Sequence, residues 1–121
     1  MGEKYKVEYT PRMEKALHKL GKEDKGLFAE VYKKMEAFEK GEFEKLVIKP
    51  IKRNKAKHQI SEIVIKSPAS YRIFYVVIDT ENNTAVFADG KRKKKRKFSS
   101  TYFSQLDDSL DIYLSRRDKN E

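Results

Sequence analysis

Residues 71–79, YRIFYVVID, predict the central strand of a sheet. The run is β-branched and aromatic, and its apolar side chains fall on both faces, as in a strand that is covered by other elements. Two similar runs flank it, ISEIVIK at 60–66 and TAVFAD at 84–89. The connecting segments, SPAS and TENN, are rich in residues that favour turns. The pattern therefore predicts a three-stranded antiparallel meander with residues 71–79 in its middle.

The N-terminal third predicts one strand and two helices. Residues 4–10, KYKVEYT, alternate between polar and apolar, which is typical of a half-buried strand. Thr10 and Pro11 supply an N-cap and a first-turn proline for a helix that Gly21 is expected to end. A second helix, ending near Gly41, has its apolar stripe at Leu27, Phe28, Val31, Tyr32, Met35 and Phe38. We expect the two helices to form a hairpin that covers the central strand.

The C-terminal segment predicts a further helix. Ser99 or Ser100 can cap it, and Tyr102, Leu106 and Leu110 then share one face. The chain of 121 residues shows no repeat or linker, so one domain spanning residues 1–121 is expected. The predicted fold class is α+β, with an N-terminal strand, an α-helical hairpin, an antiparallel β-meander and a C-terminal helix.

Composition excludes several kinds of site. The chain has no cysteine, which excludes disulfides and thiolate metal centres. No apolar run approaches the length of a membrane span, and no signal-peptide segment begins the chain, so a soluble cytoplasmic protein without membrane contact is expected. Neither His18 nor His58 has neighbours at metal-ligand spacing, and no glycine-rich phosphate loop occurs. We therefore expect no metal and no cofactor.

Positive charge is concentrated in two segments. The formal net charge is +9, from 28 Lys and Arg against 19 Asp and Glu. Residues 45–58 hold six of the cations and residues 91–97 hold seven, and neither segment contains an acid. Removing these thirteen cations leaves 15 basic residues against 19 acidic ones. Such concentrated charge favours binding to a phosphate polymer, although it is also compatible with two solvated loops.

The residue inventory suits one reaction in particular. Cations and tyrosines are abundant, but His58 is the only candidate for a base, and no activated serine or cysteine is evident. RNA cleavage tolerates this inventory because the ribose 2′-OH is itself the nucleophile. Lysine and arginine can stabilise the charge that develops on the phosphorus, and a lysine among other cations can move a proton.

The chain resembles the RelE/HigB superfamily of bacterial toxin-antitoxin toxins. The resemblance rests on the order of elements, on YRIFY in the central strand and on Gly-Lys-Arg at 90–92 after the last strand. It covers nearly the whole chain. It implies a ribosome-dependent mRNA endonuclease, or mRNA interferase, that inhibits translation, arrests growth and is held inactive by a cognate antitoxin. The implied partners are that antitoxin, the ribosome and mRNA.

The resemblance also implies catalytic residues. Arg72 follows the tyrosine of the central strand, at a phosphate-stabilising position of the RNase members. Arg92 matches the arginine after Gly-Lys, with Arg96 as an alternative because the cationic run is long. Tyr102 or Phe103 falls where those RNases place an aromatic residue that stacks on a base or orients the 2′-OH, and only Tyr102 carries a hydroxyl.

The first meander strand departs from the family pattern. RelE-type enzymes place a pair of lysines there, whereas this chain has Glu62, Val64 and Lys66. Some HigB-type relatives use histidine and acidic residues, which makes His58 a candidate for proton transfer.

The two basic segments supply the predicted RNA-binding residues. In an up-down-up meander, Lys66, Arg72 and Gly90 lie at one edge of the sheet, and residues 45–58 enter from the opposite edge. Whether both segments line one groove stays open. The predicted RNA contacts are Lys52, Arg53, Lys55, Lys57, Lys66, Lys91, Lys93, Lys94, Lys95, Arg96 and Lys97.

Two other functions fit the sequence. A ParE-type toxin has a related fold and poisons gyrase without nuclease chemistry, and a non-catalytic RNA- or ribosome-binding module needs the cations alone. Arg72 can also pair with Glu62 or Asp89 across the sheet in a purely structural role. The run 91–97 further resembles a nuclear localisation signal.

Overall fold

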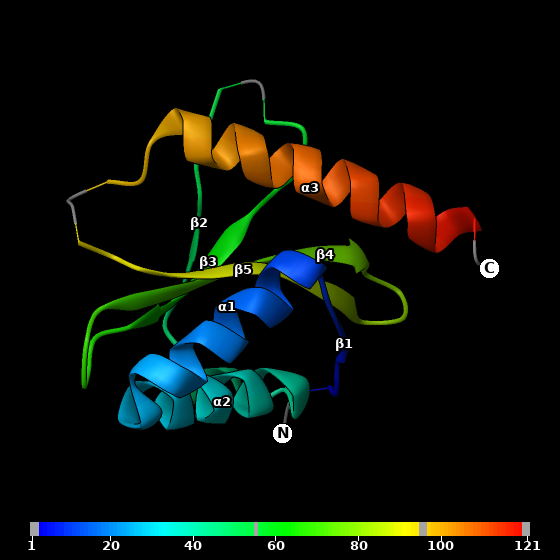
Figure 1. Cartoon of the computed structure of the whole chain (residues 1–121). Helices are drawn as coiled ribbons and strands as arrows, with labels where there is room; N and C mark the ends of the chain where they lie inside the picture. The colour runs from blue at the N-terminus through cyan, green and yellow to red at the C-terminus, as the bar shows by residue number, and fades with distance from the viewer. Residues whose placement is uncertain (1–2, 55, 95–96, 120–121) are drawn as a thin grey trace.

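A computed structural model describes residues 3–54, 56–94 and 97–119, and these residues form an α+β fold in the predicted order of elements (Figure 1). The elements are β1 (Lys6–Tyr9), α1 (Pro11–Glu23), α2 (Lys25–Glu39), a 3₁₀ turn η1 (Phe43–Lys45), β2 (Ile48–Pro50), β3 (Ser61–Ile65), β4 (Tyr71–Asp79), β5 (Thr84–Arg92) and α3 (Ser100–Lys119). No helix in the described part of the chain is long and apolar enough to span a bilayer.

The described strands form one mixed sheet in the order β1-β5-β4-β3-β2. The predicted antiparallel meander of β3, β4 and β5 is confirmed, and β4 is its central strand. β1 adds to the free edge of β5 in parallel, and β2 adds to β3 in antiparallel. The sequence did not predict β2, because its three residues end at a proline and lie in the segment expected to be a loop.

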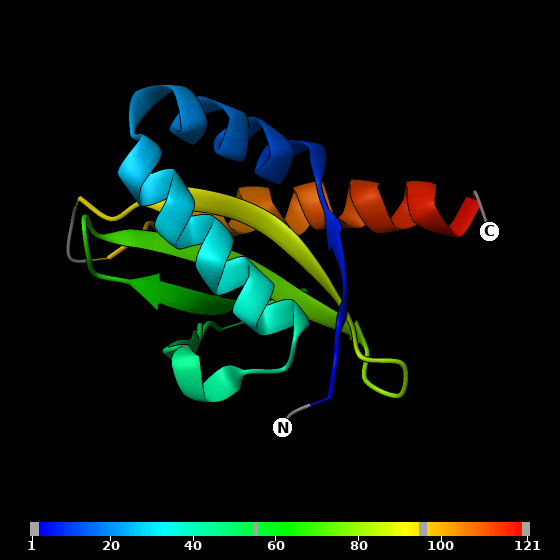
Figure 2. The same cartoon turned by 90° about the horizontal axis from the view of Figure 1, so that it is seen from below.

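Helices cover both faces of the sheet (Figure 2). The hairpin of α1 and α2 covers one face, where Phe38, Tyr75 and Phe87 belong to a buried cluster that also includes Met13 and Val31. α3 covers the other face, over a second buried cluster formed by Ile60, Phe74, Val76, Val86, Ala88, Tyr102, Phe103, Leu106 and Leu110. β4 therefore contributes to two cores, which explains its apolar residues on both faces.

Side-chain caps set the helix ends. Thr10 accepts a hydrogen bond from the Met13 amide and begins α1 as predicted. The prediction that Gly21 ends this helix is wrong, because α1 continues to Glu23 and the Phe28 ring lies against the missing Cβ of Gly21. Asp24 caps the start of α2 through the Leu27 amide. Ser99 caps α3, since its hydroxyl accepts from the Tyr102 amide.

Two further expectations are corrected. Tyr32 was placed in the apolar stripe of the second helix, but it is 56% exposed, because it lies on the outer side of α2 beside Phe28. The last meander strand was expected to end at Asp89, but β5 continues through Arg92, because Lys91 and Arg92 pair with the first residues of β4. The first two cations of the 91–97 run are therefore part of the sheet.

Candidate functional site

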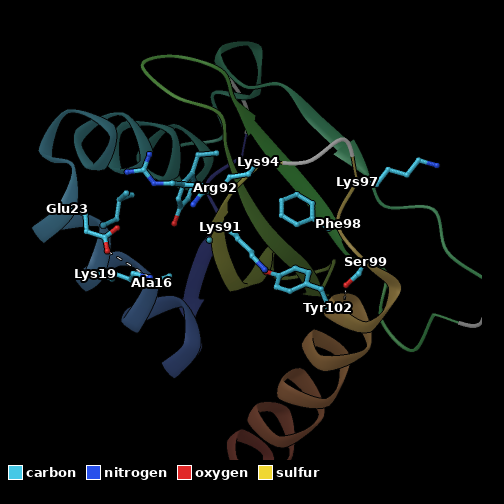
Figure 3. A pocket seen from close by; sticks show the side chains of 13 residues that line it. Ala16, Lys19, Glu23, Lys91, Arg92, Lys94, Lys97, Phe98, Ser99 and Tyr102 are labelled. Carbon is cyan, nitrogen blue, oxygen red and sulfur yellow. Dashed lines mark hydrogen bonds and ion pairs between the residues drawn. The ribbon is translucent and has the colours of Figure 1, made fainter.

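A cavity of about 770 Å³ lies at the end of β5, between α1 and the start of α3 (Figure 3). β1 ends at Tyr9 and the chain turns into α1, so no described strand pairs with the last residues of β5 on that side. The cavity is lined by Ala16, Lys19, Leu20 and Glu23 of α1, by Tyr71, Gly90, Lys91 and Arg92 of the sheet, and by Lys94, Lys97, Phe98, Ser99 and Tyr102.

A bulge in β5 determines which way these side chains face. Tyr75 pairs with Phe87 but Phe74 pairs with Asp89, so Ala88 is an extra residue in β5. The Ala88 carbonyl is held by the Thr10 hydroxyl at 2.7 Å. Asp89 consequently faces α3, and Lys91 lies on the same side.

The Asp89 carboxylate joins three elements. It accepts a hydrogen bond from the Tyr102 hydroxyl at 2.6 Å, one from Arg12 Nε at 3.2 Å and one from the Gly90 amide at 2.9 Å. Arg12 belongs to α1 and Tyr102 to α3, and Asp89 is only 7% exposed. The side chain that fixes the Tyr102 hydroxyl is thus a buried carboxylate of the sheet.

Tyr102 is enclosed on several sides. Its ring packs against Phe74, Phe98 and Phe103, and the Lys91 ammonium lies 4.4 Å from the ring centroid. Burial, followed by the charge of Asp89, raises the pKa of Tyr102 far above the ordinary value for tyrosine. The hydroxyl is therefore un-ionised across the physiological range, and the packed ring leaves little surface on which a base could stack.

Gly90 makes room for Tyr71 beneath the cavity. A Cβ at Gly90 would lie 2.5 Å from the Tyr71 hydroxyl oxygen and 2.9 Å from Cε1 of its ring. Burial, and then Asp89, raises the pKa of Tyr71 to about 12. The glycine of the Gly-Lys-Arg sequence is thus required by close packing in the cavity floor.

The cavity is cationic. Five basic side chains line it and Glu23 is its only lining carboxylate among the described residues. Arg92 pairs loosely with Asp24 at 3.5 Å, and Lys19 lies 3.9 Å from Glu23. No described carboxylate forms an ion pair with the remaining three, which are Lys91, Lys94 and Lys97. The positive charge of these three lysines is thus not neutralised by any described carboxylate.

Arg72 is held beside the cavity rather than in its wall. Arg72 of β4 lies opposite Lys91 in the register with β5. Its Nε donates to Glu62 Oε1 at 3.3 Å. Its Nη1 donates to Ser70 Oγ and to the carbonyls of Ile65 and Tyr71. Its Nη2 has no acceptor among the described residues and is not fully enclosed. The pairing with Glu62 is the structural role that the sequence allowed.

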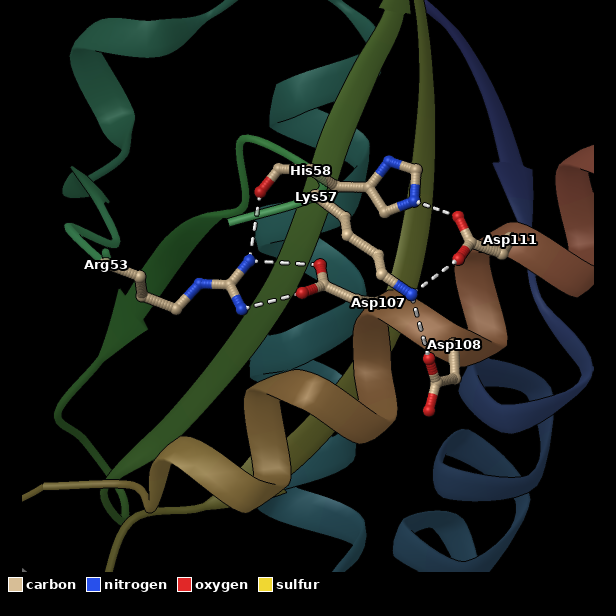
Figure 4. Close-up of polar contacts among 6 residues, drawn as sticks. All are labelled: Arg53, Lys57, His58, Asp107, Asp108 and Asp111. Atoms are coloured by element: carbon tan, nitrogen blue, oxygen red, sulfur yellow. Dashed lines mark hydrogen bonds and ion pairs between the residues drawn. The ribbon is translucent and has the colours of Figure 1, made fainter. Parts of the chain in front are cut away.

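None of the described residues of the 45–58 segment lines the cavity. Three of its side chains bind aspartates of α3 instead, on a different part of that helix (Figure 4). Arg53 donates two hydrogen bonds, of 2.9 and 3.0 Å, to the Asp107 carboxylate. His58 Nε2 lies 2.8 Å from Asp111 Oδ1.

Lys57 also contacts aspartates of α3, at 3.5 Å from Asp108 and 3.4 Å from Asp111. The bond to His58 is the largest cause of a lowered pKa at Asp111. Asp111 follows Tyr102 by nine residues on α3, which corresponds to roughly 13 Å along the helix axis. His58 is therefore positioned as a partner of Asp111 and away from the Tyr102 hydroxyl.

The other predicted residues are divided between the cavity and its surroundings. Arg92, Tyr102, Lys91, Lys94 and Lys97 line the cavity. Lys52 and Lys66 are exposed elsewhere, and the Lys93 amide bonds the Ser70 carbonyl beside it. Phe103 is a buried residue of α3. Lys55, Lys95 and Arg96 lie outside the described residues.

Sequence reasoning gave no site role to Arg12 or Asp89. Asp89 directly precedes the Gly-Lys-Arg sequence, and an acid at the end of an apolar strand is a signal that could have drawn attention to it. Arg12 lies 77 residues away in the first turn of α1, where no local pattern indicates its partner. The described residues contain no cluster of histidine and carboxylate side chains that could hold a metal ion.

No protein-family model and no curated protein matches the chain. Among solved structures, the chain is similar to a chain of the toxin-antitoxin complex RelBE2 from Mycobacterium tuberculosis. The two are 24% identical, and the match covers 76% of this chain and 94% of that chain with a TM-score of 0.49.

Proposed function

We propose that the chain is the toxin of a type II toxin-antitoxin pair, and that it cleaves ribosome-bound mRNA. In this proposal the ribose 2′-OH attacks the adjacent phosphorus, and a cognate antitoxin holds the enzyme inactive. The observation that carries the proposal is the cationic cavity around Tyr102, whose Lys91, Lys94 and Lys97 have no described carboxylate partner.

The cavity suits a phosphodiester better than a small neutral ligand. Unpaired ammonium groups attract phosphate oxygens, and Arg72 Nη2 and Arg92 add planar donors at the same end of the sheet. Fixed positive charge beside a phosphorus atom stabilises the dianionic transition state of transphosphorylation. The observed order of strand, hairpin, meander and helix is also the order that the family resemblance implies.

Expression of the chain alone is expected to arrest growth and to produce new mRNA ends. Attack by the 2′-OH leaves a 2′,3′-cyclic phosphate on one fragment and a 5′-hydroxyl on the other. Mapping of mRNA 5′ ends after brief induction, with and without the antitoxin, measures this directly. Arrest with intact mRNA and gyrase-linked DNA breaks would favour the ParE-type alternative, and uncleaved mRNA in arrested ribosomes would favour a binding module.

Binding to RNA is expected to weaken with salt through the lysines of the cavity. Each phosphate contact on single-stranded RNA contributes about −0.7 to the slope of log K against log salt. Lys94→Gln with Lys97→Gln should therefore make the slope shallower by roughly 1.4 if each lysine neutralises one phosphate. Fluorescence anisotropy of a labelled RNA across a salt series measures the slope.

The matched control exchanges two exposed lysines that do not line the cavity, Lys4→Gln with Lys33→Gln. The control removes the same net charge, so a general effect of protein charge would change both slopes equally. An equal change in both double variants would show that the RNA does not enter the cavity.

A further inference from the structure

Asp89 is a buried carboxylate that the family resemblance does not assign, yet it accepts a hydrogen bond from the buried Tyr102 hydroxyl in the cavity wall. Its Oδ2 lies 2.6 Å from the Tyr102 oxygen, within the range over which a proton moves between hydrogen-bonded groups. The bulge at Ala88 sets this contact, because without the extra residue Asp89 would face the helical hairpin. The fold thus places the Asp89 carboxylate where it accepts a hydrogen bond from the Tyr102 hydroxyl.

We propose that Asp89 is the proton acceptor of RNA cleavage and acts through Tyr102, an inference that rests on the proposed nuclease function. The 2′-OH donates a hydrogen bond to the free lone pair of the Tyr102 oxygen. As the 2′-oxygen bonds to phosphorus, its proton passes to the Tyr102 oxygen, and the Tyr102 proton passes to Asp89 Oδ2. The bond from phosphorus to the 5′-oxygen breaks, and that oxygen takes a proton from the Lys91 ammonium.

The proton balance closes without a cofactor. Asp89 ends protonated, Lys91 ends neutral, Tyr102 regains its original state, and solvent restores both of the others. Tyr102 alone does not suffice, because burial and Asp89 keep its pKa too high for a phenolate base. His58 does not fill the role either, since its ring nitrogen is bonded to Asp111 on another part of α3.

The charged and titratable groups around Asp89 come from four elements. Arg12 reaches it from α1 and Tyr102 from α3, while Tyr71 faces it from β4. Lys91 follows on β5 with its ammonium over the Tyr102 ring. Arg12 keeps the buried carboxylate oriented toward Tyr102 by bonding the same oxygen atom.

Asp89→Asn tests the relay because the amide oxygen can still accept from Tyr102 but cannot take its proton. General acid-base groups contribute about 10²- to 10⁴-fold to rate, so a loss of at least about 100-fold is expected in single-turnover cleavage of ribosome-bound mRNA. The loss should fall on the cleavage step, with RNA affinity changed far less, and a merely structural role would not confine the loss to that step. Circular dichroism checks that the variant is folded.

The matched control is Asp107→Asn, which removes another buried carboxylate bound to an arginine, outside the cavity. It is expected to cleave at the wild-type rate. Tyr102→Phe keeps the ring packing and should lose as much rate as Asp89→Asn. The double variant should lose no more than either single one, because the two groups act as a unit.

The outcomes separate the two proposals. If wild-type protein cleaves no RNA on or off the ribosome, the proposed function fails and the relay fails with it. If wild-type protein cleaves but folded Asp89→Asn keeps the wild-type rate, only the relay is overturned. Additive losses in the double variant would likewise overturn the relay, and they would leave the nuclease assignment standing.

Discussion

Arg72→Met is expected to lower the free energy of unfolding by about 3–5 kcal/mol, the range for breaking a buried ion pair from one side. The variant removes the partner of Glu62, and both side chains are largely buried, with 9% and 11% exposed. It also removes the donor for the Ile65 and Tyr71 carbonyls and for Ser70. Equilibrium unfolding in urea measures the loss.

Replacing both partners at once is the control for this prediction. Arg72→Met with Glu62→Leu leaves neither member of this pair as an unpartnered buried charge, so it should recover most of the lost stability. If the double variant is no more stable than Arg72→Met alone, the loss comes from the other hydrogen bonds of Arg72 and not from the stranded carboxylate.

Arg72→Lys distinguishes a role of Arg72 in protein stability from a role in RNA cleavage. The lysine keeps a positive charge beside Glu62, but it lacks the planar guanidinium group of arginine. One ammonium group cannot bond the acceptors of Arg72 within the protein and also place a nitrogen in the position of Nη2. Under the proposed function, cleavage should fall about 10²- to 10³-fold, the usual effect of removing one donor that stabilises a transition state. RNA affinity should change far less. Cleavage at the wild-type rate would assign Arg72 to the fold alone.

The fold was predictable wherever a local pattern sufficed. The three meander strands, the Thr10 cap and the Ser99 cap each follow from spacing within a few residues. The bulge at Ala88 does not, because a local alternation of side chains cannot show where one strand gains a residue relative to its partner. β2 was missed for a related reason, since a three-residue strand is defined only by its pairing with β3.

The site was less predictable because charge in the sequence does not reveal which charges are paired. The two basic segments look alike as strings of lysine and arginine. In the structure, Arg53 and His58 are bound to aspartates more than fifty residues away, while Lys91 keeps no described carboxylate partner. Both outcomes depend on contacts between distant segments, as does the bond from Arg12 to Asp89.

Phe74→Ala and Phe38→Ala are each expected to cost about 3–5 kcal/mol of stability, the usual loss for a buried phenylalanine. Both rings are almost fully buried, but they lie on opposite faces of the sheet. Phe74 packs against Phe98, Tyr102 and Phe103 next to the cavity. Phe38 belongs to α2 of the helical hairpin and packs against rings that include Tyr75 and Phe87 of the sheet.

The pair therefore distinguishes loss of stability from loss of site geometry. A small domain has only about 5–15 kcal/mol of stability, so the leucine variants serve if the alanine variants unfold. Phe74→Leu should slow single-turnover cleavage, because Tyr102 loses the ring that holds it in line with Asp89. Phe38→Leu should be destabilised to a similar degree and cleave at the wild-type rate below its unfolding transition. Equal loss of cleavage in the two variants would contradict this, because it would mean that activity follows overall stability and not the packing beneath Tyr102.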